Sequence, residues 1–143
     1  FVRYFLRKKL FLFFEKINKD NSTIFVVTAN YQELVKAFLE ENDIFERINL
    51  KVVGTELPKK NEFFHKKILK GKLKAKKISQ MFIEKKIEIS DFDIYNFFNS
   101  YEDRYLCKLA THNILISTFN QKKIKYFKKN FNVITYKDFM KKV

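Results

Sequence analysis

Short runs of β-branched and aromatic residues alternate along this chain with longer stretches in which apolar residues recur every three or four positions. The short runs predict buried strands, and the longer stretches predict amphipathic helices. Strands are expected at five places: Ile24 to Val27, Leu50 to Gly54, Ile94 to Phe98, Asn113 to Ile116 and Asn132 to Thr135. Strands that alternate with helices favour a parallel sheet, because a crossover helix carries the chain back to the edge where it started.

The helices between these strands have their own signals. Asn30 and Glu33 have the spacing of a capping box at a helix start. Further helices are expected from near Leu73, from about Glu102 and around Lys122 to Lys129. We therefore expect an α/β fold: a Rossmann-like, mostly parallel sheet with helices on both faces.

With 143 residues, 46% of them hydrophobic, the chain can bury the core of one domain. The single cysteine, Cys107, excludes an intramolecular disulfide and fits a buried thiol in a reducing compartment, so we expect a cytoplasmic protein. No uncharged apolar run approaches the ~20 residues that span a bilayer. The predicted core residues are Phe25, Val27, Leu34, Phe38, Val53, Ile78, Phe97, Leu106, Leu109 and Ile114.

The formal net charge of +14 attracts anionic partners such as nucleic acid, acidic lipid and phosphorylated metabolites, without choosing among them. Pairs of lysines are scattered along the chain, which is typical of solvated helix faces. Near the carboxyl terminus, aromatic residues interleaved with lysines suit a surface that stacks single-stranded bases. At helical spacing, however, Ile124, Phe127 and Phe131 also predict a buried stripe.

Polar residues follow two of the predicted strands. Thr28, Ala29 and Asn30 end the first strand and provide a hydroxyl and backbone amides that suit a phosphate oxygen. Asn99, Ser100 and Asp103 follow a later strand and provide oxygens that suit Mg²⁺. In open parallel sheets, ligands bind at the carboxyl ends of the strands, so both clusters are candidate sites.

Four sequence pieces occur in an order that resembles the haloacid dehalogenase-like hydrolase superfamily, in its phosphoserine phosphatase-like branch. They are "VVTAN" at Val26 to Asn30, "VVGTEL" at Val52 to Leu57, "GKLK" at Gly71 to Lys74 and "FNSYED" at Phe98 to Asp103. They correspond to the second motif, a "GTEL"-like stretch, the third motif and the fourth motif of that branch. The resemblance covers about Lys16 to Tyr136.

The resemblance implies a Mg²⁺-dependent phosphatase that acts on a small phosphorylated metabolite through an aspartyl-phosphate. Thr28 would hydrogen-bond the transferring phosphoryl group, with Ala29 and Asn30 beside it in the substrate site. Lys74 would neutralise its charge, and Asn99 and Asp103 would support the metal. Lys76 and Lys77 are alternatives for the functional lysine, although the position of Gly71 favours Lys74.

The chain departs from the family pattern at two places. Asn99 stands where the fourth motif has a metal-binding aspartate, which removes one negative charge. No D-x-D-x-T motif, which carries the family's nucleophilic aspartate, precedes Thr28; Asp91-Phe92-Asp93 has the first three letters but continues with Ile94 and Tyr95. We expect a helical cap that is reduced or missing, with residues 1–20 as its remnant or an amino-terminal helix and residues 21–143 as the core domain.

Two explanations of the missing nucleophile remain open: the motif lies upstream of residue 1, or the chain is a degenerate relative. In both cases little activity is expected from these residues alone. The alternative function is a non-catalytic basic module that binds nucleic acid or an acidic membrane surface, motivated by the +14 charge. The oligomeric state stays open.

Overall fold

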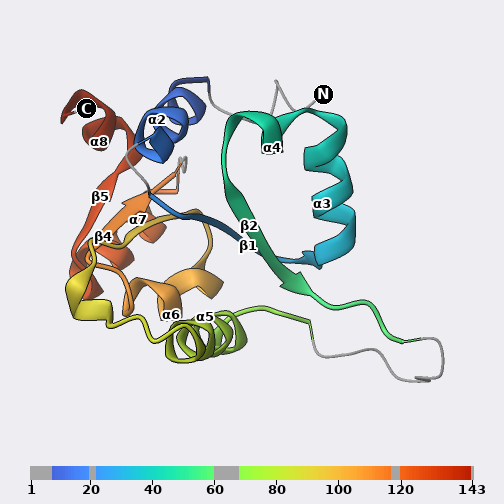
Figure 1. The fold of residues 1–143 in the computed structure, drawn as a ribbon. Helices are drawn as coiled ribbons and strands as arrows, with labels where there is room; N and C mark the ends of the chain where they lie inside the picture. Colours follow the sequence, from blue (N-terminus) through green and yellow to red (C-terminus); the bar gives the residue numbers. More distant parts are fainter. Residues whose placement is uncertain (1–7, 20–21, 60–67, 117–119, 143) are drawn as a thin grey trace. The chain divides into compact units, whose positions relative to one another are not determined.

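The computed structural model describes residues 8–19, 22–59, 68–116 and 120–142, and it divides into two compact units, Phe1–Leu69 and Lys70–Val143 (Figure 1). Each unit contains its own parallel sheet. The sequence-based division at residue 20 stays a prediction, and residues 1–7 of the expected amino-terminal segment lie outside the described residues. Within the described residues, no helix combines the length and the apolar character needed to cross a bilayer.

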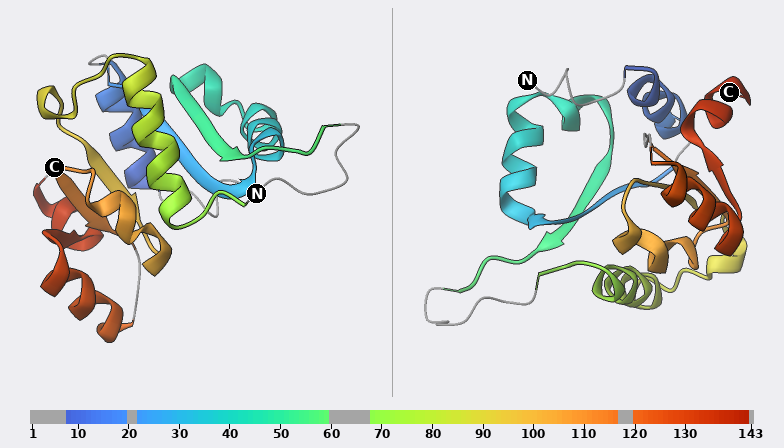
Figure 2. Two further views of the ribbon diagram at one scale, coloured as in Figure 1. Left: turned by 90° about the horizontal axis from the view of Figure 1, so that it is seen from below. Right: turned by 180° about the vertical axis from the view of Figure 1, so that it is seen from behind.

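The first unit is built around two parallel strands. Its elements are α2 (Lys8–Lys19), β1 (Ile24–Tyr31), α3 (Gln32–Glu41), α4 (Ile44–Arg47) and β2 (Leu50–Thr55). β1 pairs with β2 so that Val26 lies opposite Val52, and Figure 2 shows α3 alongside β2. Leu39 and Ile44 pack against Val52 in the core of this unit, with Val35 beside them. The helix therefore covers one face of the strand pair.

The second unit contains three parallel strands in the order β3-β4-β5. Its elements are α5 (Lys72–Glu84), η1 (Ile89–Asp91), β3 (Tyr95–Phe98), η2 (Tyr101–Asp103), α6 (Arg104–Cys107), β4 (His112–Leu115), α7 (Gln121–Asn130), β5 (Val133–Thr135) and α8 (Tyr136–Lys142). Ile114 of the central strand lies between Phe97 and Ile134 in the register. Because all three strands run in the same direction, their carboxyl ends share one edge of the sheet.

The core of the second unit is aromatic. Phe127 of α7 is completely buried, and its ring centroid lies 4.8 Å from that of Phe98 on β3. Two asparagines that face each other across β3 and β4 are also partly or fully buried: the Asn96 amide donates to Asn113 at 3.1 Å, and Asn113 donates to the carbonyl of Cys107 at 3.0 Å. These bonds satisfy polar groups that would otherwise destabilise the sheet.

The structure confirms the five predicted strands, their parallel direction and the α/β class. It also confirms helices at the predicted places and the stripe of α7, in which Ile124 and Phe131 pack against the cluster around Phe127. The strands are grouped in two small sheets. Local periodicity does not predict this grouping, because it identifies strands without identifying their partners.

The predicted core is correct at Val53, Ile78 and Ile114, which are buried, and wrong at Leu34 and Phe38, which are 63% and 38% exposed. The reason is that α3 carries two adjacent apolar rows. Val35 and Leu39, four residues apart, form the row that packs on the strands. Leu34 and Phe38 form the neighbouring row, which lies outside the contact. The remaining predicted residues are partly buried: Phe25, Val27, Phe97, Leu106 and Leu109.

The predicted capping box at Asn30 is also wrong. β1 continues through Asn30 to Tyr31, and Tyr31 precedes α3 without any side-chain cap bond. Gln32, the first helical residue, instead accepts a hydrogen bond through its side-chain oxygen from the backbone N–H of Gly54, at 3.2 Å. Pairing with β2 therefore extends the strand beyond the residues that the local cap signal assigned to a turn.

The orientation of α3 gives a matched test. Leu39→Ala should lower the free energy of unfolding by about 2–5 kcal/mol, because it removes a buried side chain. Leu34→Ala on the same helix should change it by less than about 0.5 kcal/mol, since Leu34 is already exposed. Denaturant unfolding of both variants checks this, and equal losses would contradict the observed orientation.

Candidate functional site

A compact turn at the carboxyl end of β3 positions the fourth-motif residues. The hydroxyl oxygen of Ser100 accepts from the backbone N–H of Glu102 at 3.2 Å, and the Ser100 carbonyl accepts from the N–H of Asp103 at 3.0 Å. These bonds close the turn η2 directly after the strand. As a result Asp103 is folded inward and only 7% of the residue is exposed.

Asp103 forms an ion pair with Lys74, which lies on the first turn of α5. The Nζ of Lys74 is 2.8 Å from Oδ1 of Asp103, and the two side chains are only 12% and 10% exposed. When two charges are removed from water to this degree, loss of either one leaves the other buried without a counter-charge, which is strongly destabilising. Of the three candidate lysines, Lys74 is the one that contacts Asp103, whereas Lys76 and Lys77 are exposed.

Gly71 sets the start of α5 and hence the position of Lys74. Its φ of 54° lies in the left-handed region that favours glycine. A Cβ at this position would also lie 2.9 Å from Oε2 of Glu102, but this atom ends a flexible, exposed side chain that can move aside, so the positive φ is the stronger requirement for glycine. Figure 1 shows α5 and α6 side by side. The "GKLK" segment thus positions Lys74 so that it contacts Asp103.

A second lysine reaches the same turn from α7. The Nζ of Lys123 donates to the backbone carbonyl of Asn99 at 3.0 Å and lies 5.3 Å from the centroid of the Tyr101 ring. Asn120 caps α7 by accepting from the N–H groups of Lys122 and Lys123, which places Lys123 on the first turn. Sequence analysis did not single out Lys123, although an asparagine cap followed by lysines is a readable signal.

The proposed metal ligands Asn99 and Asp103 come from this same turn. Asn99 is exposed, and Asp103 already balances its charge against Lys74. In the described part of the chain, no group of three or more His, Cys, Asp or Glu side chains gathers. One neutral amide and one paired carboxylate are a weak donor set for Mg²⁺, which prefers one or two free carboxylates with waters and substrate phosphates. Magnesium binding therefore stays a prediction.

The other predicted site residues lie in the first unit, at the carboxyl end of β1. The register of β1 against β2 shifts between Val27 and Tyr31, so the backbone at Thr28, Ala29 and Asn30 leaves the regular ladder. The hydroxyl oxygen of Thr28 accepts from the N–H of Asn30 at 3.1 Å. Ala29 and Asn30 are exposed, and Thr28 is partly buried.

Residues of β2 hold this segment in place. The hydroxyl of Thr55 donates to the carbonyl of Ala29 at 2.7 Å and accepts from the N–H of Leu69 at 2.9 Å. A Cβ on Gly54 would lie 2.7 Å from the carbonyl oxygen of Asn30, so only glycine permits this approach of the two strands. The Gly54–Thr55 pair of the "GTEL"-like stretch therefore has a structural role that the residues alone did not indicate.

The predicted site residues thus form two groups, one in each unit. Thr28, Ala29 and Asn30 gather at the end of β1. Lys74, Asp103 and the backbone of Asn99 gather at the end of β3, with Lys123 as an additional member.

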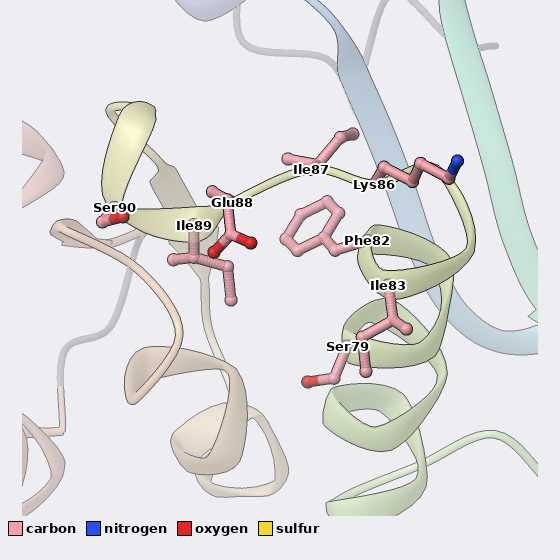
Figure 3. Close-up of a pocket in the computed structure, with 8 residues that line it drawn as sticks. All are labelled: Ser79, Phe82, Ile83, Lys86, Ile87, Glu88, Ile89 and Ser90. Atoms are coloured by element: carbon pink, nitrogen blue, oxygen red, sulfur yellow. The ribbon is translucent and has the colours of Figure 1, made fainter.

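A separate pocket of about 470 Å³ lies at the other end of α5 (Figure 3). Phe82 and Ile83 of the helix and Ile87 and Ile89 of the following loop give it a largely apolar lining, with Lys86 among its charged residues. Lys74 lies on the first turn of the helix, and none of the predicted site residues lines this pocket. The pocket and the ion pair are therefore distinct features of the second unit.

No protein-family model, curated protein or solved structure matches this chain.

The thiol of Cys107, the last residue of α6, is buried. Burial, and then the negative charge of Asp103, raise the pKa of Cys107 from 9.0 to about 12. A thiol with so high a pKa stays protonated at neutral pH and is a poor nucleophile. The predicted role of Cys107 as a buried structural thiol agrees with its 3% exposure.

Cys107 should therefore resist alkylation in the folded protein. We expect slow reaction with iodoacetamide between about pH 7 and pH 9, and fast reaction once guanidinium unfolds the chain, because unfolding exposes the thiol and returns its pKa to the ordinary value. Mass spectrometry of the labelled protein measures both rates. Rapid labelling under native conditions would contradict the burial of this side chain.

The ion pair should couple strongly in a double-mutant cycle. Lys74→Met and Asp103→Asn should each lower the free energy of unfolding, by about 3–5 kcal/mol for the lysine change, because Lys74→Met leaves the Asp103 carboxylate buried without a counter-charge. The double variant should recover more than about 1 kcal/mol of the summed loss. The exposed pair Lys141 and Asp138, at 3.9 Å, provides the matched control and should couple by less.

Proposed function

We propose that this chain is the phosphate-binding core of a haloacid dehalogenase-like phosphatase that acts on a small phosphorylated metabolite. The observation that carries the proposal is the buried contact of Lys74 with Asp103 at the carboxyl end of a parallel strand. This contact joins the third-motif lysine to the fourth-motif aspartate, two residues that lie 29 positions apart in the sequence. A contact between these two residues is expected if the segments correspond to the third and fourth motifs of the family.

The chemistry of the site follows from these groups. Asp103 holds the ammonium group of Lys74 in place, so that a phosphoryl group bound at the end of β3 would meet a pre-oriented positive charge. Phosphoryl transfer depends chiefly on positioning and charge stabilisation, which such a lysine provides. In the first unit, considered by itself, the resemblance implies that Thr28 would donate its hydroxyl hydrogen to a phosphoryl oxygen. A bound Mg²⁺ would neutralise further charge on the phosphate.

Strand order supports the Rossmann-like part of the proposal. The Rossmann sheet has the order 3-2-1-4-5-6, so that omission of strand 1 leaves a pair 3-2 and a triple 4-5-6. The described strands form the parallel pair β2-β1 and the parallel triple β3-β4-β5. In the family pattern the D-x-D-x-T motif follows the strand before the second-motif strand, which is the position of strand 1. The orders of the two sheets, each taken by itself, support this part of the proposal.

The nucleophile is the element that these residues do not supply. Asp91 ends η1 and Asp93 precedes β3, so this D-x-D sequence lies at the amino end of the strand, whereas Lys74 and Asp103 meet at its carboxyl end. It therefore serves as the entry to β3, as the sequence predicts. Residues 1–143 should bind phosphate without forming an aspartyl-phosphate.

Phosphate binding and turnover test the proposal together. Titration of the protein with propyl phosphate, followed by NMR shifts of backbone amides, should show binding at the turn after β3. Lys74→Gln should weaken it by about tenfold or more, through loss of a charge-assisted hydrogen bond. Hydrolysis of p-nitrophenyl phosphate with Mg²⁺ should stay close to the rate without protein.

Matched variants separate loss of charge from loss of folding. Lys74→Arg keeps the charge and should retain most of the affinity, while Lys76→Gln removes an exposed lysine of the same helix and should have little effect. Thr28→Val tests the role of its hydroxyl independently of Lys74. Substantial turnover that depends on none of these residues, or affinity lost in Lys76→Gln instead of Lys74→Gln, would refute the proposal.

Salt dependence distinguishes the alternative of a basic binding module. Exposed lysines occur on α3, α5, α7 and α8. Binding to single-stranded nucleic acid would release counterions from several phosphates and fall steeply with ionic strength. If tight binding to an oligonucleotide at physiological salt survived Thr28→Val combined with Lys74→Gln, the binding module would replace the phosphatase core as the better account.

A further inference from the structure

Three cationic side chains converge on one aromatic ring beside the Lys74–Asp103 pair. The Nζ of Lys72 lies 5.6 Å from the centroid of the Tyr105 ring, the guanidinium carbon of Arg104 lies 4.4 Å from it, and the Nζ of Lys108 lies 5.8 Å from it. The Nη2 of Arg104 also donates to the Tyr105 hydroxyl at 2.8 Å. We call Lys72, Arg104, Lys108 and Tyr105 the Tyr105 cluster.

The Tyr105 cluster adjoins the proposed phosphate site through two continuous elements. Lys72 and Lys74 both lie on the first turn of α5, where Lys72 approaches Tyr105 and Lys74 binds Asp103. Asp103 is followed directly by Arg104, the first residue of α6. The cluster and the ion pair therefore share the first turn of α5 and the junction of η2 with α6.

The cluster has an excess of positive charge. Glu102 lies next to Gly71 at the start of α5. Its single negative charge is smaller than the positive charge of the three cations together. Among the described residues, Lys72 and Lys108 form no ion pair, and both are exposed. The faces of aromatic rings attract cations, but by only about 0.5–1 kcal/mol at exposed sites. Cations gathered around one ring repel each other, and an anion bound among them would relieve that repulsion.

We propose that the Tyr105 cluster binds a second phosphate group of the substrate, so that the substrate is a small molecule with two phosphates. This inference rests on the proposed function, in which the first phosphate binds at Lys74. Arg104 would contribute its planar guanidinium, which suits phosphate oxygens, and Lys72 and Lys108 would add two flexible charges. Selectivity for a bisphosphate would then come from the Tyr105 cluster.

Two matched probes test the inference. Propyl phosphate carries one phosphate, and the bisphosphate ester of propane-1,3-diol carries a second on the same short chain. At constant ionic strength, the unmodified protein should bind the bisphosphate about tenfold tighter than propyl phosphate, measured by calorimetry or by amide shifts. In Lys72→Met combined with Lys108→Met, this ratio should fall to about one, while the affinity for propyl phosphate changes less than about twofold.

Lys128→Met combined with Lys129→Met is the control, because it removes two exposed charges from the last turn of α7 and should keep the ratio.

If propyl phosphate binds in a manner that depends on Lys74 but the bisphosphate binds no tighter, the second site is refuted and the phosphatase core stands. If neither probe binds the unmodified protein, both fail. A short single-stranded oligonucleotide that binds tighter than either probe, with affinity lost in Lys72→Met combined with Lys108→Met, would assign the cluster to nucleic acid and overturn the inference.

Discussion

The buried ion pair between Lys74 and Asp103 organises the second unit. It joins the first turn of α5 to the turn after β3, and it does so with side chains that are almost fully removed from water. Neither residue is suited to burial alone, because an isolated charge in a protein interior is strongly destabilising. The pair therefore constrains the positions of α5 and of the turn after β3 at once.

Cationic side chains from several elements gather around the turn that contains Asp103. Lys123 reaches the carbonyl of Asn99 from α7, and the Tyr105 cluster lies on the side of α5 and α6. Positive charge therefore lies on both sides of a turn that contains only two carboxylates, Glu102 and Asp103. An excess of positive charge attracts anions in general.

Glycine makes the close approaches on which both candidate groups depend. At Gly71 the positive φ, which glycine adopts without strain, lets α5 start against the turn after β3. At Gly54 the absence of a side chain lets β2 lie against the carbonyl of Asn30. The chain has only these two glycines, and each lies within one of the motif-like segments. Their placement supports the view that the segments are structural units with a function, although glycine alone says nothing about the ligand.

The sequence by itself determined the strands, their parallel direction and the places of α3, α5, α6 and α7, because these follow from hydrophobic periodicity and from the alternation of strands with helices. It also pointed to Lys74 and Asp103 through ordered motifs. Only the tertiary structure decided that Val35 and Leu39, and not Leu34 and Phe38, face the strands, since a helix with two apolar rows is ambiguous until its partner is present. It likewise decided that β1 extends through Asn30, that Lys74 rather than Lys76 or Lys77 meets Asp103, and that Lys123 and the Tyr105 cluster approach the same turn. These features depend on contacts between residues far apart in the chain, and no local pattern specifies which distant residues will meet.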